Sequence, residues 1–285
     1  MDVEMYRYFS VTQDNRISQS AYSPSKSSEL NRCQKRFLLL MASHIEKGDD
    51  EFKIQKFKFR DFMKIMGIKD GGNTEKNIRD SIESLNSKTF LLDSADGKKS
   101  EALHWVDYAY VDWDEKTVNI RLSESLKAFY LNLSECFTSF SLGFTTDFTC
   151  KYSYRVYEFL HSYSAQGKII VEREKALRVL GNDNYDKVAD FERYVLRKAV
   201  EEINEYSDLV VNYYRRKSGR KVTHFFFIIK RKSQEEINEI RDTWVQKKSL
   251  YEDLASEFDK LLDSNRDDEM KKEVKISNIY QTEVV

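Results

Sequence analysis

The chain has 285 residues, of which 40% are hydrophobic and 13% aromatic; this is enough for one large or two modest packed domains and excludes wholesale disorder. No apolar run approaches the ~20 residues of a membrane span, and the polar N-terminus lacks the apolar centre of a signal peptide. We therefore expect a cytoplasmic protein without membrane contact. Cys33, Cys136, Cys150 and four scattered histidines form no metal-ligand pattern, so we expect reduced cysteines and no metal site.

The net charge of −1 conceals an uneven distribution along the chain. Residues 145–232 carry 18 basic and 12 acidic residues, a net charge of +6, whereas residues 233–285 carry 8 and 14, a net charge of −6. A basic segment before an acidic tail is typical of a domain that binds a polyanion such as nucleic acid. Ordinary surface charge would explain the same numbers equally well, so this signal needs a second indication.

The first half of the chain predicts helices that are followed by β-strands. Residues 1–26 form a polar arm with possible short strands, closed by the only proline, Pro24. Gly67 and the turn before Thr74 separate the predicted helices, and Asn73 or Thr74 is a candidate cap. In chain order we expect a helix near 28–47, a short strand around 52–57, helices over 60–66 and 73–86, strands over 89–92, 102–111 and 117–122, and a helix over 124–131.

The second half repeats this order of elements. We expect a helix near 147–164, a strand over 169–171, helices over 172–180 and 187–206, and a hairpin formed by strands 209–214 and 222–229. Helix, strand, helix, turn, helix and hairpin is the element order of a winged helix, in which a β-wing backs a helix-turn-helix unit. The sequence thus predicts an α+β chain with two tandem winged-helix domains, over 27–140 and 141–232.

Residues 233–285 predict an acidic helical tail. Over 234–262 its apolar residues follow the three-four spacing of a heptad seam, interrupted only by Lys247. The seam residues are Ile237, Ile240, Trp244, Tyr251, Leu254, Phe258 and Leu261. Such a seam either packs on the tail's own domain or contacts a second copy or another partner, and the sequence leaves both open.

The helix over 187–206 is the one that a winged helix lays in the major groove. Its apolar stripe must face the core, and arginines on the other side can pair with guanine edges, at about 1–3 kcal/mol of discrimination per good contact. The residues on or near that outer face are Lys187, Asp190, Arg193, Tyr194, Arg197 and Lys198. We expect the acidic rear of the helix, Glu201, Glu202 and Glu205, to point away from phosphates. A solvated amphipathic helix would show the same pattern.

The hairpin turn of the second half is strongly basic. Five cations fall within seven residues, namely Arg215, Arg216, Lys217, Arg220 and Lys221. A turn that serves only solubility seldom carries charges of a single sign. A cationic wing suits contact with phosphates or the minor groove, and such contacts supply sequence-independent affinity. The equivalent helix of the first half offers Lys76, Asn77 and Arg79 among mixed charges, which predicts a mixed role in DNA contact and self-association.

The second half resembles the iteron-binding plasmid replication initiators. Residues 153–158, with the sequence SYRVYE, match their S-x-R-x-Y-E helix, and residues 217–224, KSGRKVTH, are similar to their K-x-G-R-x-x-T-H wing. Residues 177–181, 185, 190–196 and 202–204 look like their recognition segment. The resemblance is specific across about 145–232, whereas over 18–140 it rests on element order.

This resemblance implies a protein of the bacterial cytoplasm that binds double-stranded plasmid origin DNA at repeated sites, the iterons. Monomers of such initiators bind iterons, dimers repress their own promoter or hold origins together, and a host initiator and the replicative helicase are further partners. The groove readers implied by position are Lys187, Arg193, Tyr194 and Arg197. The residues implied to hold the DNA backbone are Lys151, Ser153, Tyr154, Arg155, Arg220, Lys221 and Thr223. Glu192 and Tyr194 stand where relatives often have arginines, which predicts fewer arginine–guanine contacts.

Two other functions stay open on the sequence alone. The same fold would serve a transcriptional repressor that binds one palindromic operator as a dimer. A nicking or priming enzyme is the third hypothesis, but the sequence has neither a G-x-x-x-x-G-K-[ST] loop nor a His-x-His pair, and nothing in it marks an activated tyrosine. We therefore expect no catalytic residues, no cofactor and no enzymatic step.

Overall fold

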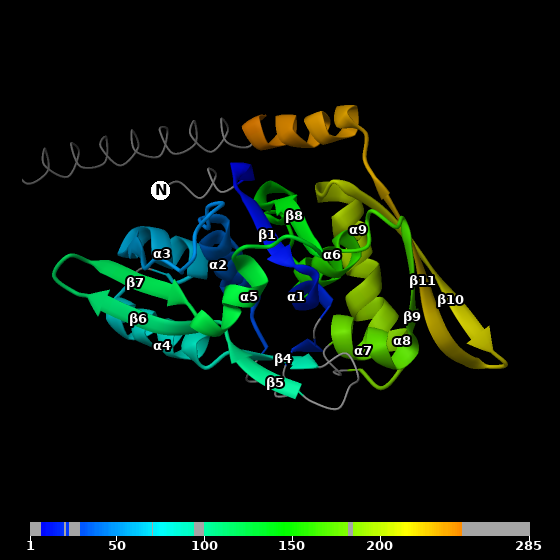
Figure 1. The fold of residues 1–285 in the computed structure, drawn as a ribbon, viewed down its shortest axis with the longest axis horizontal. Helices are drawn as coiled ribbons and strands as arrows, with labels where there is room; N and C mark the ends of the chain where they lie inside the picture. The colour runs from blue at the N-terminus through cyan, green and yellow to red at the C-terminus, as the bar shows by residue number, and fades with distance from the viewer. Residues whose placement is uncertain are drawn as a thin grey trace, which may run out of the picture. The chain divides into compact units, whose positions relative to one another are not determined.

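The computed structural model describes residues 7–19, 21–22, 29–69, 71–93, 100–181 and 185–246. Contacts between residues divide the chain into one unit that ends at Gln234 and another that begins at Glu235. The described part of the first unit contains four small antiparallel β-sheets with helices packed around them (Figure 1). Two of these sheets, together with their helices, repeat one arrangement.

The first repeat of this arrangement lies in the N-terminal half. Its elements are α2 (Arg32–Ser43), β3 (Gln55–Lys58), α3 (Phe59–Met66), α4 (Thr74–Asn86), β6 (Val106–Asp112) and β7 (Thr117–Leu122). The strand β7 pairs with both β6 and β3, so the sheet order is β3-β7-β6. The rings of Phe37 and Phe62 meet at 5.3 Å, and with Ile78 and Val118 they bring the three helices and β7 into one core.

The second repeat lies in the C-terminal half. Its elements are α6 (Ser153–His161), β9 (Lys168–Glu172), α7 (Arg173–Gly181), α8 (Val188–Phe191), a π-helical turn (Glu192–Leu196), α9 (Arg197–Tyr206), β10 (Leu209–Ser218) and β11 (Lys221–Arg231). The second hairpin strand again pairs with the first strand of the domain, in the order β10-β11-β9. The structure therefore confirms the predicted order of two winged helices.

Additional elements surround the first winged helix. They are β1 (Ser10–Asp14), α1 (Asn15–Gln19), β2 (Ala21–Tyr22), β4 (Thr89–Asp93), β5 (Ser100–His104), α5 (Lys127–Tyr130) and β8 (Phe137–Ser141). Short 3₁₀ turns at Glu124–Leu126 and Leu142–Thr145 precede α5 and follow β8. The described part of the predicted arm packs against the rest of the fold, because β1 pairs along its whole length with β8 and buries Val11.

Helix boundaries agree with local sequence signals where these are strong. Asn31 and Gln34 form a reciprocal capping box at the start of α2, and Gly67 ends α3 with a φ of +68°, a backbone conformation that favours glycine. Asn73, one of the two predicted candidates, is the N-cap residue of α4. Its side chain makes no capping hydrogen bond, and the Thr74 hydroxyl bonds with the backbone of Gly71.

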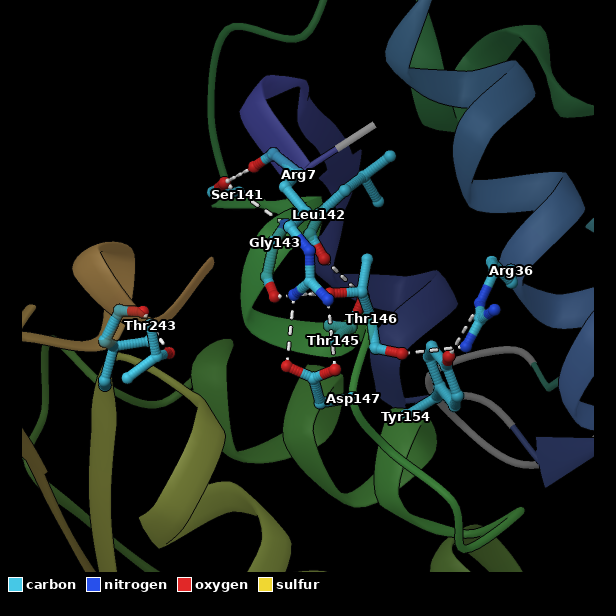
Figure 2. Close-up of polar contacts among 11 residues, drawn as sticks. Arg7, Arg36, Ser141, Leu142, Gly143, Thr145, Thr146, Asp147, Tyr154 and Thr243 are labelled. Atoms are coloured by element: carbon cyan, nitrogen blue, oxygen red, sulfur yellow. Dashed lines mark hydrogen bonds and ion pairs between the residues drawn. The ribbon is translucent and has the colours of Figure 1, made fainter. Parts of the chain in front are cut away.

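Buried polar contacts join the two winged helices. The Lys35 ammonium of α2 lies 2.8 Å from the Glu158 carboxylate of α6, and both side chains are buried. Before α6, the two guanidinium Nη atoms of Arg7 each donate to Asp147 at 3.1 Å (Figure 2). Arg36 donates to the Thr146 carbonyl at 2.8 Å (Figure 2). Because a buried ion pair requires good geometry, the Lys35–Glu158 pair constrains how α2 meets α6. The boundary at 140/141 between the two domains stays a prediction.

The acidic rear of the last long helix differs from the sequence prediction at Glu202. Glu201 and Glu205 are exposed as expected, but Glu202 is only 2% exposed. Its carboxylate accepts hydrogen bonds from the backbone N–H groups of Thr149 and Cys150 at 3.2 Å. It also accepts from the hydroxyl of Ser153 at 2.6 Å. Glu202 therefore connects α9 with the first residue of α6 and with the two residues Thr149 and Cys150 that precede this helix.

Substitution of Glu202 by alanine leaves the buried Ser153 hydroxyl, and the backbone N–H groups of Thr149 and Cys150 just before α6, without this acceptor. We expect the free energy of unfolding to fall by about 2–4 kcal/mol, since hydrogen bonds to a charged group are strong and buried unpaired donors are costly. Urea denaturation of the purified chain measures this. The matched control is Glu201→Ala, one residue away and exposed, which should stay within about 0.5 kcal/mol. Equal stabilities for the two variants would contradict this role of Glu202.

Candidate nucleic-acid interface

The segment from Lys187 to Tyr206 has one buried and one exposed face. The buried residues are Phe191, Val195, Leu196, Ala199, Glu202 and Ile203. The predicted groove readers Lys187, Arg193, Tyr194 and Arg197 are all exposed, as is Lys198, whereas Asp190 is half-buried. The π-helical turn interrupts the segment at Glu192–Leu196, where Arg193 and Tyr194 lie. Single π turns are frequent at functional sites, and sequence periodicity did not predict this one.

Two other tyrosines, Tyr152 and Tyr185, support the exposed ring of Tyr194 in this segment. Tyr152 is buried, and its hydroxyl shares a 3.2 Å hydrogen bond with that of Tyr185. The ring of Tyr185 stacks on that of Tyr194, with centroids 6.1 Å apart and planes 18° apart. The Arg193 guanidinium lies 5.2 Å from the Tyr194 ring centroid. In the sequence, Tyr185 was named only as part of the family's recognition segment. Its packing against Tyr152 and Tyr194 could not be predicted from that pattern.

The wing of the second domain is cationic at its tip. Arg216, Lys217, Arg220 and Lys221 are exposed around the turn at Gly219, whose φ of +58° suits glycine. Figure 1 shows the β10–β11 hairpin extending beyond α7 and α8. The pairing register shifts between Arg216 and Lys217, as in a β-bulge, and the Thr223 hydroxyl donates to the Arg216 carbonyl. An exposed basic hairpin of this kind can follow a phosphate backbone.

An ion pair connects the wing with the recognition segment. The guanidinium of Arg215 lies 3.1 Å from the carboxylate of Glu192, whose side chain is only 12% exposed. Arg215 was predicted to contact DNA, but the structure gives it this internal partner as well. Glu192 therefore orients a wing residue.

A cleft of about 710 Å³ separates the wing from the helices of the second domain. Its lining combines the β9–α7 junction, the first residue of α8 and the start of β11: Glu172, Arg173, Glu174, Val188, Arg220, Lys221, Val222, Thr223 and His224. Three cations face two carboxylates there. The predicted backbone contacts Arg220, Lys221 and Thr223 thus share one concave surface beside the recognition segment.

Three residues predicted to hold the DNA backbone are buried, which contradicts that prediction for their side chains. Ser153 donates to Glu202, and the Arg155 guanidinium donates to the carbonyl of Val179. Tyr154 is 1% exposed, and burial raises the pKa of its phenol. The S-x-R-x-Y-E pattern therefore marks buried packing, both within the second domain and against α2 of the first. Lys151 remains partly exposed, and its ammonium lies 3.2 Å from Glu29.

The first domain presents a smaller version of the same surface. Lys76, Asn77 and Arg79 of α4 are exposed, and the Arg79 guanidinium lies 4.5 Å from the ring centroid of Trp113 in the β6–β7 turn. A cleft of about 610 Å³ lies between α3, the start of α4 and this turn. Its lining is Phe59, Arg60, Met63, Lys64, Ile68, Thr74, Glu75, Trp113 and Lys116. Trp113 was not among the residues predicted from the sequence, although a tryptophan beside a hairpin turn is a visible signal.

The described residues contain no group of three or more side chains placed to hold a metal ion. No helix among them is both long enough and apolar enough to cross a bilayer. For the predicted tail, a helix runs over 234–246, and the rest of the expected heptad seam, from Lys247 on, lies outside the described residues.

Comparison with known proteins identifies the family to which these two domains correspond. Residues 10–161 match the family model described as "Initiator Replication protein, WH1", and residues 175–229 match "Initiator Rep protein, WH2". The chain belongs to the initiator Rep protein family. It is a plasmid replication initiator with two winged-helix domains, as the resemblance predicted.

One solved structure shows a slight likeness to this initiator. It is the crystal structure of domains 2 and 3 of RctB, with 15% sequence identity, and the match covers 64% of this chain and 75% of that chain. Its TM-score is 0.36, and no conclusion about this initiator depends on it.

Replacing Arg220 and Lys221 together by alanine should weaken binding to every DNA sequence by a similar factor. Both cations are predicted to contact phosphates, so the slope of log K against log[salt] should become shallower by about one unit per lost contact. Fluorescence anisotropy over a series of salt concentrations measures both effects. The control is Lys47→Ala, an exposed lysine after α2 of the first domain. An unchanged salt slope in the double variant would show that the wing does not contact phosphates.

Proposed function

We propose that the second winged helix reads each origin repeat through the exposed face of residues 187–197, while the basic wing holds the adjacent DNA backbone. The observation that carries this proposal is the Glu192–Arg215 ion pair, because it joins the groove-facing segment and the wing into one surface. Arg193, Tyr194, Arg197 and Lys187 are all exposed on that surface. Base contacts there would specify the sequence and the wing would position the duplex.

The first winged helix has a supporting role in this proposal. Lys76, Asn77 and Arg79 are exposed on its second helix-turn-helix helix, which suits contact with the rest of the repeat. Self-association through the same domain would give the homodimer that the family resemblance implies. The buried Lys35–Glu158 pair supports a fixed placement of the two domains, so that one monomer spans neighbouring segments of one repeat.

Origin opening follows from binding to several repeats. Bending of the DNA costs a few kcal/mol, on the order of 1–6 for a 20–30 base-pair site, and concentrates strain in an adjacent AT-rich region. A host initiator and the replicative helicase would then be recruited to the opened strands. We propose that the chain itself catalyses no step, and that its exposed basic residues serve binding alone. A supercoiled plasmid incubated with Mg²⁺ should therefore stay intact and free of covalently bound protein.

Fluorescence anisotropy on DNA that flanks the gene tests the function. Duplexes with direct repeats of ~20 base pairs, two helical turns, are compared with scrambled duplex at several salt concentrations. We expect a preference of ~10³-fold or more at physiological salt. Sedimentation on one-repeat DNA should show a bound monomer, whereas a palindrome bound only by a stable dimer would favour the repressor alternative. Equal, steeply salt-dependent binding to both duplexes would contradict sequence-specific recognition.

Substitution of Arg193 by alanine should relax specificity at one or two base positions of the repeat. The loss of a bidentate contact with guanine corresponds to about 1–3 kcal/mol. Competition binding with single-base variants of the repeat measures the change. The wing variant of Arg220 and Lys221 is the comparison, because it should weaken all duplexes together. The same uniform loss in both variants would refute the division of roles between helix and wing.

A further inference from the structure

Tyr194 differs from the other exposed residues of the recognition segment in its chemistry. Lys187, Arg193 and Arg197 are cations that seek acceptors on DNA, whereas Tyr194 exposes 50% of a large aromatic side chain. A single exposed aromatic is common on protein surfaces and indicates nothing by itself. Its surroundings supply the second observation, because Tyr194 is held in place from one side.

The stack with Tyr185 restrains the Tyr194 ring before any ligand is present. Tyr185 is fixed through its hydroxyl to buried Tyr152, and its ring lies nearly parallel to that of Tyr194. A tyrosine phenol is neutral at physiological pH, and burial and the Tyr152 hydrogen bond raise the pKa of Tyr185 further above that pH. A preorganised ring loses little conformational entropy when it contacts a ligand.

The feature of duplex DNA that suits an apolar ring in the major groove is the C5-methyl group of thymine. It is the one apolar group that base pairs display there, and the other readable atoms are hydrogen-bond donors and acceptors. Arg193 lies against the same ring, with its guanidinium 5.2 Å from the centroid. Neighbouring base pairs are about 3.4 Å apart along the duplex. The separation between the Arg193 guanidinium and the Tyr194 ring therefore suits contact with two adjacent base pairs.

We propose that Tyr194 contacts the methyl group of a thymine beside the guanine that Arg193 reads, and that Tyr185 is the positioning residue for this contact. The proposal rests on the function proposed above and deepens it by naming one base feature of the repeat. In this proposal, Arg193 and Tyr194 together recognise a guanine and an adjacent thymine.

Replacement of thymine by uracil, one position at a time in the repeat duplex, tests the contact because it removes only the methyl group. Arg193→Ala should identify one base position at which the protein no longer discriminates between bases. Replacing the thymine next to that position by uracil should weaken binding of the wild-type protein about fourfold. That factor corresponds to the burial of one methyl group. Tyr194→Ala should bind the thymine and uracil duplexes equally. Tyr194→Phe should keep the discrimination, because the hydroxyl takes no part.

The positioning role of Tyr185 has its own readout. Tyr185→Ala should reduce the thymine-to-uracil ratio while the discrimination between guanine and other bases at the Arg193 position persists. Tyr214→Ala removes another exposed tyrosine, on β10, and should leave the ratio unchanged. Thermal unfolding by circular dichroism confirms that each variant is folded, and a ratio of affinities within one variant is insensitive to partial loss of active protein.

The possible results separate the proposal from the function on which it rests. Specific binding to the repeat with no thymine sensitive to uracil, or with equal sensitivity in Tyr194→Ala, overturns the methyl contact and leaves the initiator function intact. The proposal is also overturned if Tyr194→Ala weakens binding to single-stranded DNA only, because the ring would then stack on unpaired bases. Absence of sequence-specific binding in the wild type overturns both.

Discussion

The buried carboxylate of Glu202 is the contact on which the geometry of the binding face depends. It accepts hydrogen bonds from the start of α6 while the opposite side of the same helical segment carries Arg193 and Tyr194 to the surface. A recognition helix that is fixed at its rear can present groove-reading side chains with a defined rotation. Several donors converge on this point from residues 149–153, so a carboxylate, which only accepts hydrogen bonds, is a fitting partner.

A second layer of polar contacts connects this face with the rest of the molecule. Glu192 bonds with Arg215 of the wing, and Glu158 pairs with Lys35 of the first domain. Glu192 thus joins two elements within the second winged helix, whereas Glu158 joins this domain to the first. An initiator that binds successive repeats needs such a fixed relation between its reading elements, because repeat spacing along DNA is set by the helical turn.

The sequence predicted the architecture well because its signals are local. Periodic apolar residues, Gly67 and the basic turn around Gly219 each indicate an element or its end without information from elsewhere in the chain. The errors concern residues whose role depends on distant partners. Ser153, Tyr154 and Arg155 look like polar surface residues in a helix, yet Glu202, Arg36 and Val179 satisfy them inside the protein. The π-helical turn and the β1–β8 pairing likewise arise from packing that no short pattern encodes.

Methylation interference on the repeat duplex tests the central claim most directly, namely that the second winged helix reads DNA in the major groove. A methyl group on guanine N7 blocks the acceptor that an arginine such as Arg193 would use, and it leaves the phosphates unchanged. The account predicts that methylation of particular guanines at the same place in each repeat excludes those duplexes from the bound fraction, and that Arg193→Ala removes this effect at one of them. Bound and free fractions with identical methylation patterns would contradict major-groove reading by this segment.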